Sequence, residues 1–388
     1  GDFALKADFD YIPGPKHYIK FGVQAIDHLF TPGVYSYRGT EEADTTFGAR
    51  KIYGREFFAY IEDDFLVTEK LKVNGGLHAS AFSVQDKFYS SLQPRISARY
   101  LLTHDLSVKA SYAEMTQFIH LLTNAGLGLP TDLWVPSTPS IGPERSKIGS
   151  AGLAYNFKSA YEISLEGYYK EMNGLIEYKD GASYLNIESD WQTKVERGSG
   201  ESYGAELLLQ KKTGRVSGWL GYTLSWTNRT FPNLNFGRTF PYKYDRRHDI
   251  ELAVAYKWKD GKDLSFTWVY GTGNAISLPQ ASYLLYLPDQ NAIRRNRFPA
   301  NYYNHRSVEH YEGRNSYRMR AYHRLDISYS KTKKTKWGEP TWTFGFYNIY
   351  NRRNPFFMDM GYDQQGNKKF IQYSLFPLIP SFTYRFKF

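Results

Sequence analysis

Apolar and polar residues alternate at every second position along most of this chain. The last eighteen residues, Ile371–Phe388, give the clearest case, and they end with aromatic residues at positions 382, 384, 386 and 388, each separated from the next by one polar residue. A period of two puts the aromatic side chains on one face of an extended strand and the polar ones on the other. We interpret this strand as part of a barrel wall between lipid and a wet lumen; the last strand of a soluble sandwich is the alternative.

The same pattern starts the chain and repeats in hairpins. Apolar positions run along Phe3–Phe9 and return along Ile19–Ala25, and a turn at Pro13–Lys16 joins the two runs. Short turns between alternating runs predict antiparallel hairpins. Seven tight turns are expected: Pro13–Lys16, Thr68–Lys70, His104–Asp105, Lys158–Ser159, Lys212–Arg215, Asp260–Lys262 and Lys331–Pro340.

The connections between these hairpins are mostly long and polar. One is short and follows Ser83, and six are loops: Thr31–Ile52, Leu122–Arg145, Glu177–Ser199, Asn228–Lys243, Pro279–Arg318 and Asn351–Asn367. The pattern therefore predicts fifteen strands, with tight turns and longer connections in strict alternation. Short turns at one rim and long loops at the other are typical of an outer-membrane barrel, an all-β transmembrane fold.

Composition supports strands that are apolar on one side only. The 388 residues include 34 Tyr, 26 Phe and 8 Trp, yet the mean hydropathy is −0.56. The sequence lacks a run of eighteen apolar residues, which excludes helical membrane spans. The absence of cysteine excludes disulfides, zinc–thiolate sites and cysteine nucleophiles. The formal charge of +10 suits nucleic acid, anionic lipid or an anionic ligand.

Aromatic residues on the apolar faces are expected near strand ends. Trp258 and Trp268 flank the Asp260 turn, Tyr100 and Tyr112 flank the His104 turn, and Trp342 follows Pro340. Aromatic rings near the ends of membrane-spanning strands predict a belt at the membrane interface, whereas the core of a soluble sandwich would place the rings at strand centres.

The odd number of strands carries a further expectation. Single-chain bacterial barrels have even strand numbers, so fifteen strands do not close one. Residues 1–388 are therefore interpreted as the C-terminal part of a single barrel domain, with additional strands before Gly1. For a plugged barrel of about 22 strands, roughly seven would precede this chain.

Several motifs resemble one family in order along nearly the whole chain. They are Gln93–Tyr100, Tyr112–Leu122, Tyr244–Asp249, Tyr270–Asn274, Tyr322–Asp326 and Tyr347–Asn351, followed by the Phe-rich closing strand. These residues resemble the TonB-dependent outer-membrane transporters of Bacteroidetes-type bacteria. The resemblance implies a 22-stranded barrel in the outer membrane of a Gram-negative cell, occluded by an N-terminal plug. Neither the plug nor the coupling box is found among these residues.

The resemblance also implies partners. A TonB energy-coupling complex would act through the absent N-terminal part, and outer-membrane lipid and lipopolysaccharide would surround the wall. The closing strand is similar to the signal that the barrel-assembly machinery recognises, carried here by Phe382, Tyr384, Phe386 and Phe388. A surface lipoprotein is a further candidate partner. Nucleic acid is not expected, because no reading helix accompanies the positive charge.

The loop Asn291–Arg320 has the most distinctive charge. Seven arginines lie there with only two acidic residues, Glu309 and Glu312. Guanidinium groups interleaved with tyrosine are suited to bind carboxylate or phosphate groups, either on a ligand or on lipopolysaccharide. The alternative is a solvated basic loop without a binding function. The candidate ligand-binding residues are Arg294, Arg295, Arg297, Tyr302, Tyr303, His305, Arg306, His310 and Tyr311.

Metal, cofactor and catalytic sites are not predicted. The spacing of His305 and His310 matches no standard metal or haem signature. The sequence of Phe231–Leu234 is explained by the formation of a turn and does not indicate a binding site. Hydrolase motifs such as Gly-x-Ser-x-Gly are missing, so we do not expect an enzyme. Glu162 and Glu166 are interpreted as lumen polarity.

Four further charged residues have the parity of the lumen face. Arg95, Arg99, Arg324 and Asp326 are expected to pair with one another or to hold the plug.

Three functions remain open from sequence alone. The first is a receptor and transporter that imports a scarce ligand (siderophore, haem, cobalamin or oligomeric nutrient) by energy-coupled gating of the plug. The second is a passive porin-like channel or an outer-membrane assembly partner. The third is an outer-membrane hydrolase. Basic, tyrosine-rich loops favour an anionic iron chelate as the ligand.

Overall fold

The computed structural model describes most of the chain. The described residues are 1–32, 35–37, 45–47, 51–124, 126–127, 132–182, 190–288 and 303–388. No helix in these ranges is long and apolar enough to cross a membrane.

Fifteen long strands form one antiparallel wall, as the sequence predicts. Each strand pairs with the next wall strand along the chain, so the strand path follows the sequence. The wall strands are β1 (Asp2–Gly14), β2 (His17–Phe30), β5 (Ile52–Leu66), β6 (Leu71–Val84), β7 (Lys87–Leu101), β8 (Leu106–Gln117), β11 (Glu144–Phe157), β12 (Tyr161–Tyr178), β13 (Val195–Lys211), β14 (Val216–Thr230), β16 (His248–Lys259), β17 (Lys262–Gly271), β22 (Tyr322–Thr332), β23 (Glu339–Tyr347) and β26 (Ile379–Lys387). A short strand, β15 (Phe240–Pro241), pairs with β14 and brings the sheet to 16 strands.

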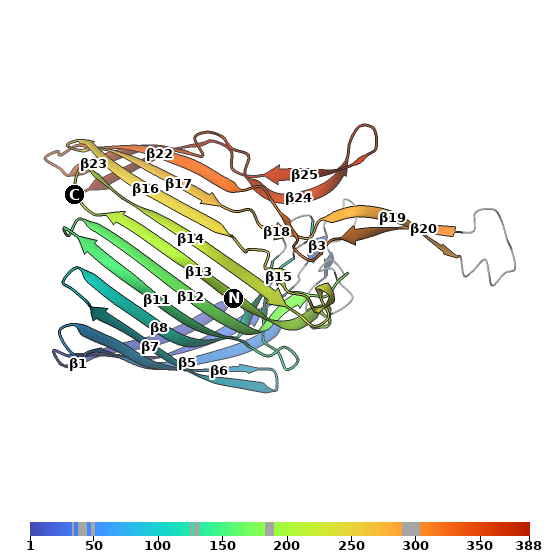
Figure 1. Cartoon of the computed structure of the whole chain (residues 1–388), viewed down its shortest axis with the longest axis horizontal. Helices are drawn as coiled ribbons and strands as arrows, with labels where there is room; N and C mark the ends of the chain where they lie inside the picture. Colours follow the sequence, from blue (N-terminus) through green and yellow to red (C-terminus); the bar gives the residue numbers. More distant parts are fainter. Residues whose placement is uncertain are drawn as a thin grey trace.

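The wall is a curved, inclined sheet whose first and last strands do not meet (Figure 1). The seven tight turns lie together at one rim, on the left of Figure 1, and the longer connections lie at the other. Both β1 and β26 run toward the tight-turn rim. The predicted alternation of short turns and longer connections is confirmed by this arrangement.

The register shows how sequence alternation becomes two different faces. On β12, odd positions such as Ile163, Leu165 and Tyr169 are exposed, and the residues between them are half-buried. The outer face is the one with the exposed apolar side chains. The inner face carries ion pairs such as Lys212–Glu162 at 2.6 Å and Lys72–Asp64 at 2.8 Å. Such a sheet matches lipid on one side and water on the other.

Two details of the prediction need correction. The closing strand is shorter than Ile371–Phe388, because Ile371–Ser374 belong to β25 (Lys368–Ser374), which pairs with β24 (Pro355–Tyr362) in a separate hairpin. The apolar positions change from odd at Ile371 and Tyr373 to even at Phe382 and Tyr384, and this change of parity marks the break. Residues 375–378 separate them.

The aromatic belt is also distributed differently from the prediction. Trp258 and Tyr100 lie at the tight-turn ends of their strands and are about half exposed, and Trp342 packs on Tyr384 close to the same rim. Tyr112 and Trp268 lie further along β8 and β17, toward the long-loop rim. Near Trp268 and Tyr270, the ring of His323 stacks on Tyr270 at 6.3 Å. The rings therefore lie at several heights along the wall and not only beside the tight turns.

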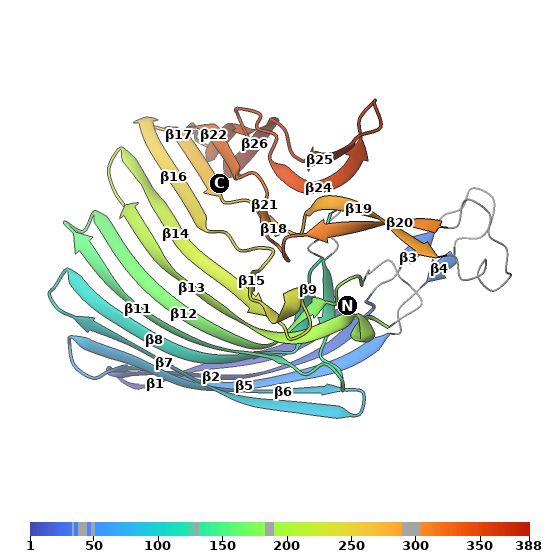
Figure 2. The ribbon, with the colours of Figure 1, turned by 45° about the vertical axis from the view of Figure 1, so that its right-hand side comes forward.

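The long connections contain short strands and turns of their own. Those outside the wall are β3 (Tyr35–Tyr37), β4 (Thr45–Phe47), β9 (Ile119–Leu122), β10 (Leu133–Pro136), β18 (Ala275–Ile276), β19 (Pro279–Pro288), β20 (Tyr303–Tyr311) and β21 (Tyr317–Arg318), with two 3-10 helices, η1 (Trp191–Lys194) and η2 (Asn235–Gly237). β9 lies inside the curve of the wall, whereas the β19–β20 hairpin projects beyond its end (Figure 2). The connections are thus partly folded structures.

An aromatic cluster joins the wall to the β8–β11 connection. Phe82 of β6 is fully buried and stacks on Phe118 with 5.1 Å between ring centroids, and Ile52 and Val84 complete the cluster. Gly54 lies against Phe82, where an added Cβ would be only 2.6 Å from the ring. The glycine therefore gives the ring its space.

Replacing Phe82 with alanine is expected to destabilise the full-length protein by about 3–5 kcal/mol, because the cavity lies in a closed cluster. The measurement is urea unfolding in lipid vesicles followed by intrinsic fluorescence. Phe88→Ala is the matched control, since the ring of Phe88 is 62% exposed on neighbouring β7. Equal losses of stability in the two variants would contradict the assignment of Phe82 to a closed core.

Candidate functional site

The long connections pack together at one end of the wall. We call this structure the loop platform and define it as residues 118–124, 132–143, 175–182, 190–195, 229–247, 272–278 and 312–320. It includes η1, η2 and the short strands β9, β10, β15, β18 and β21. The platform lies at the long-loop rim, on the right of Figure 1, partly within the curve of the wall.

Two apolar clusters hold the platform together. The larger contains Leu122, Val135, Ile141, Ile176, Tyr178, Trp191 and Val195. The smaller contains Leu175, Phe231, Leu234 and Phe240. Each cluster combines residues from separate parts of the chain, so packing between the loops holds the platform together.

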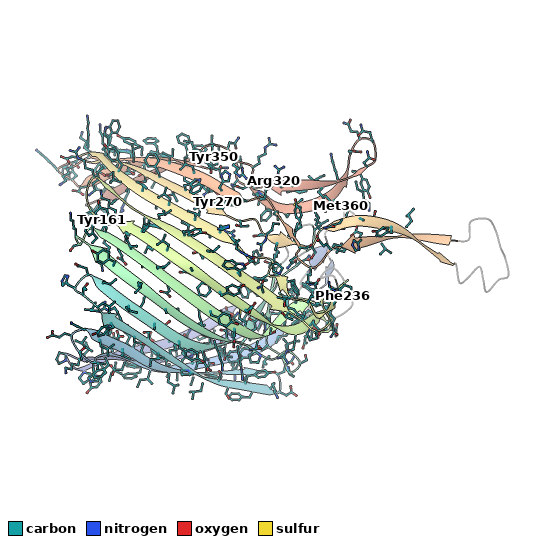
Figure 3. The ribbon with its side chains drawn as sticks, in the orientation of Figure 1. Tyr161, Phe236, Tyr270, Arg320, Tyr350 and Met360 are labelled. Carbon is teal, nitrogen blue, oxygen red and sulfur yellow. The ribbon has the colours of Figure 1, made fainter. Side chains whose placement is uncertain are left out.

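Phe231–Leu234 belongs to the smaller cluster. Phe231 and Leu234 are both buried, at 0% and 1% exposure. Phe236, two residues later, is 95% exposed at the outer end of the platform (Figure 3). The tetrapeptide is therefore a packing element of the loops, in line with its interpretation as turn chemistry.

Glu177 is the central charge of the platform. Its carboxylate is buried and accepts hydrogen bonds from Arg229 Nη1 at 2.9 Å and from Arg314 Nη2 at 3.1 Å. Arg314 Nη1 also reaches the exposed Asp180 at 2.8 Å. The Arg229 guanidinium lies over the Tyr242 ring at 3.7 Å. The ends of two wall strands, β12 and β14, and the β20–β21 connection therefore meet at one carboxylate.

A second buried carboxylate repeats this arrangement. Asp245 accepts hydrogen bonds from Arg318 and from the backbone N–H of Thr227, the latter at 2.7 Å. Arg247 Nη2 is 3.5 Å from the same carboxylate, and its guanidinium lies 4.4 Å from the Trp226 ring centroid. This network ties β21 and the β14–β16 connection to the wall.

The third ion pair connects the β8–β11 and β14–β16 connections. Lys243 Nζ lies 3.0 Å from Asp132 Oδ1, and the Tyr244 hydroxyl donates to the same carboxylate. Burial and this hydrogen bond raise the pKa of Tyr244, so its phenol stays protonated. Charged groups deep in the platform are thus matched by opposite charges.

Steric crowding explains why position 273 is occupied by glycine. A Cβ there would come within 2.0 Å of the Met319 carbonyl oxygen, next to the short β18–β21 pairing. The predicted motif Tyr270–Asn274 therefore contains a position where two connections touch by their backbones.

His120 has neighbours that resemble a catalytic arrangement. Its Nδ1 is 3.0 Å from Glu144 Oε1, and its Nε2 is 3.0 Å from Ser137 Oγ. Both His120 and Ser137 are fully buried, so a substrate carbonyl has no access to the serine oxygen. We interpret this trio as a buried polar bridge between β9 and the wall.

The structure divides the predicted ligand-binding residues. Arg294, Arg295, Arg297 and Tyr302 lie outside the described residues. The backbones of Tyr303, His305 and Arg306 lie in β20, and their side chains are outside the described part of the chain. His310 and Tyr311 are exposed at the end of β20. The described members of this set are thus on the projecting hairpin.

Tyr311 is held as a neutral phenol. Its hydroxyl donates to Glu309 Oε2 at 2.8 Å, and burial together with this bond raises the pKa of Tyr311 to about 12. His310 contacts the edge of Tyr283 with 6.2 Å between centroids. In the described residues, His, Cys, Asp and Glu side chains do not gather in groups of three that could hold a metal ion.

The alternative of a solvated basic loop does not hold for two arginines of the stretch Asn291–Arg320. Arg314 and Arg318 are partly buried and hold Glu177 and Asp245. Sequence reasoning missed these acidic partners, because Glu177 lies 137 residues from Arg314 and Asp245 lies 73 residues from Arg318. The local sequence gave no signal of such distant pairs.

A small pocket lies between the two projecting hairpins. Its volume is about 220 Å³, and its lining includes Gln280, Glu309, Met360, Lys368 and Phe370. Figure 3 labels Met360 near the base of the β19–β20 hairpin. The combination of amide, carboxylate, ammonium and ring is a mixed polar and apolar surface.

The predicted lumen residues form one pair and two separate positions. Arg324 Nε donates to Asp326 Oδ2 at 2.9 Å, and Arg324 Nη1 donates to the hydroxyls of Tyr322 and Tyr347. Arg99 instead lines an inner hollow of about 440 Å³ with Lys109 and Glu166, which form an ion pair with each other.

Arg95 lines a second hollow, of about 260 Å³, with Lys6 and Glu62. The two β7 arginines lie on the far side of the wall from β22, so they do not pair with Arg324 or Asp326.

An inclined antiparallel wall with one apolar and one polar face, closed at one end by packed loops, defines the class of transmembrane β-barrel walls. A family model described as "TonB dependent receptor-like, beta-barrel" matches residues 2–351. The chain belongs to this family of TonB-dependent receptor barrels.

Solved structures of similar fold include three receptors for ferric ligands. One is the ferripyoverdine receptor of the outer membrane of Pseudomonas aeruginosa, with 14% sequence identity and a TM-score of 0.57. The match covers 99% of this chain and 47% of the receptor chain. The ferric citrate transporter FecA matches with 12% sequence identity and a TM-score of 0.57, and the match covers 97% of this chain and 52% of the FecA chain. The ferric-catecholate import receptor Fiu of E. coli K12 matches with 14% sequence identity and a TM-score of 0.58, and the match covers 99% of this chain and 55% of the Fiu chain.

The chain spans about half the length of the solved structures that it matches. At these identities the likeness establishes the fold. The comparison with curated proteins found no match.

Changing Glu177 to glutamine is expected to lower the free energy of unfolding of the platform by about 3–5 kcal/mol, because Arg229 and Arg314 lose their shared buried partner. The measurement is hydrogen exchange of residues 229–245 and 311–320 in the full-length protein, where amide protection should fall.

Asp180→Asn is the matched control for Glu177→Gln. Asp180 pairs with the same Arg314, but its side chain is 64% exposed. Its loss should cost less than about 1 kcal/mol. Unchanged exchange in Glu177→Gln, or equal changes in both variants, would rule out a central role for the buried carboxylate.

Proposed function

We propose that this chain is the C-terminal wall portion of a TonB-dependent importer in the outer membrane of a Gram-negative, Bacteroidetes-type cell. In this proposal the remaining wall strands and a plug come from sequence upstream of residue 1. The membership of the chain in the TonB-dependent receptor family supports it. The half-length matches to receptor structures are consistent with it.

The loop platform is the observation that carries this proposal. A passive pore needs an open mouth, whereas here several connections pack into a core at one end of the wall. Three buried ion networks fix these loops in place. A preorganised surface of this kind suits a receptor that captures its ligand before transport, because less ordering free energy is lost on binding.

The ligand that we infer is an anionic ferric chelate, taken from the wider set of siderophore, haem, cobalamin or oligomeric nutrient. Three proteins of similar structure are a ferripyoverdine receptor, a ferric citrate transporter and a ferric-catecholate import receptor. Arginine is abundant in the stretch from Arg294 to Arg306, which joins β19 to β20 or lies within β20. Guanidinium groups bind carboxylate or catecholate oxygens with charge-assisted hydrogen bonds.

The partners follow from the proposed location. The TonB complex would act on the plug, and Arg95 and Arg99 would contact the plug from the inner hollows that they line. The lipid-facing wall would contact outer-membrane lipid and lipopolysaccharide, and a surface lipoprotein would bind over the projecting hairpins. The barrel-assembly machinery would recognise the last strand.

Import is expected to depend on the energy-coupling protein. Cells that express the full-length protein should accumulate radio-iron from ferric citrate or a ferric catecholate at least tenfold faster when TonB is present, because the plug must be pulled to open the lumen. Uptake assays in matched strains with and without TonB measure this difference. Equal uptake in both strains would favour a passive channel and reject the importer.

Phe388→Ala is expected to reduce assembly of the full-length protein several-fold, because Phe388 is the fully exposed terminal ring of the proposed assembly signal. Heat-modifiable gel mobility of outer-membrane fractions measures the folded amount. Phe236→Ala removes an equally exposed ring at the opposite rim and should leave assembly unchanged. Normal assembly of Phe388→Ala would remove this residue from the signal.

A further inference from the structure

The tight-turn rim between β11 and β26 is strongly basic. The four turns there and the strand ends beside them contain eleven basic residues and four acidic ones, Glu162, Asp260, Asp263 and Glu339. The basic residues are Lys158, Lys211, Lys212, Arg215, Lys257, Lys259, Lys262, Lys331, Lys333, Lys334 and Lys336. This excess of seven positive charges compares with +10 for the whole chain.

Three of these lysines form a row across neighbouring strands. Lys259 of β16 is the register partner of Lys262 of β17, and Lys262 is the partner of Lys331 of β22. Side chains that face each other in this way have Cβ atoms about 5 Å apart, and like charges directly opposite are destabilising. In the described residues, no carboxylate forms an ion pair with any of the three. The row therefore lacks a counter-charge from the protein.

The row lies on the lipid-facing side of the wall. Lys262 has the same parity as Leu264 and Phe266, and Lys331 has the same parity as Ile327 and Tyr329. The next register partners on the neighbouring strands are Trp342 and Tyr384, whose rings are 5.8 Å apart. Trp and Tyr rings mark the headgroup level of a membrane, so the three ammonium groups reach the same depth.

Other lysines of this rim also turn toward the outer face. Lys211 Nζ lies 5.8 Å from the Tyr161 ring centroid, and Lys158 Nζ lies 5.0 Å from that of Phe157. Tyr161 is on the tight-turn rim in Figure 3. Both rings are exposed on the outer face. The positive charge is thus directed at the surrounding lipid.

We propose that Lys259, Lys262 and Lys331 bind the phosphate of an anionic phospholipid headgroup, of the phosphatidylglycerol type. A phosphodiester with no ammonium group of its own supplies the missing counter-charge at the right depth. A zwitterionic headgroup supplies it less well, because its own cation is repelled by the row. This inference depends on the proposed location in the outer membrane, and it adds a specific lipid contact in the leaflet that borders the tight turns.

The test is native mass spectrometry of the full-length protein, purified in detergent and titrated with phosphatidylglycerol at low salt. Each lysine near a lipid surface contributes about fivefold in affinity. The triple variant Lys259→Gln, Lys262→Gln and Lys331→Gln should therefore bind phosphatidylglycerol more than about tenfold more weakly. The triple change to arginine should retain binding, because it keeps the charge.

The matched control changes three exposed lysines of the long-loop rim, Lys87, Lys368 and Lys369, to glutamine. It removes the same charge and should change binding less than about twofold. Wild-type affinity in the first triple variant, or equal losses in both, would overturn the inference. Full competition by inorganic phosphate would also overturn it, since the site would then not select lipid.

Two other results separate this inference from the proposed function. Uptake that does not require TonB, with lipid binding intact, would reject the importer and leave the lysine row. Normal TonB-dependent uptake with no phosphatidylglycerol preference would reject the lysine row alone.

Discussion

The hydrogen bonds between neighbouring strands are the constraint on which the rest of this structure depends. In a lipid environment the backbone N–H and C=O groups cannot find water, so each wall strand must satisfy them with its neighbours. The ladder is nearly uninterrupted here: β12 and β13 pair from Tyr161–Lys211 to Tyr178–Val195, with one irregularity near Asn173. A fixed register then fixes which side chains face lipid, because a slip of one residue would exchange the two faces.

The two rims use this constraint in different ways. At the tight-turn rim the chain reverses within a few residues, and charged turns lie next to aromatic rings. At the long-loop rim the same strands continue into connections that bury Phe231, Trp191 and Leu122 in clusters of their own. The wall is therefore rigid scaffolding for a second, smaller folded layer, and chemical variety is concentrated in that layer.

The wall was predictable from sequence because its signal is local. Alternation along Phe3–Phe9 or Tyr161–Tyr169 needs only the pleat of one strand, and each tight turn is marked by Gly, Pro, Asp or Lys. The same local signal did not show that Ile371–Ser374 belong to a separate hairpin, in which they pair with β24. Period alone does not say which neighbour a strand will choose.

The loop platform was not predictable, since its bonds join residues far apart in sequence. Arg314 resembled other arginines of a basic loop, and its partner Glu177 ended a strand with no sign of a buried charge. The resemblance to a receptor family supplied the class of protein and left these contacts unspecified. Folded-state geometry was needed to show that two of the arginines are structural.

One carboxylate shared by two loops also restricts how this surface can diverge. Arg229 at the end of β14 and Arg314 in the β20–β21 connection are far apart in the chain, yet both depend on Glu177. A charge reversal at any of these three positions has to be compensated at the others, so the loops around them are obliged to change together. The hairpin of β19 and β20 carries no such obligation at its exposed positions. Substitutions at the exposed positions of that hairpin are therefore less restricted than substitutions at the buried arginines, and sequence divergence of this surface is expected to concentrate there.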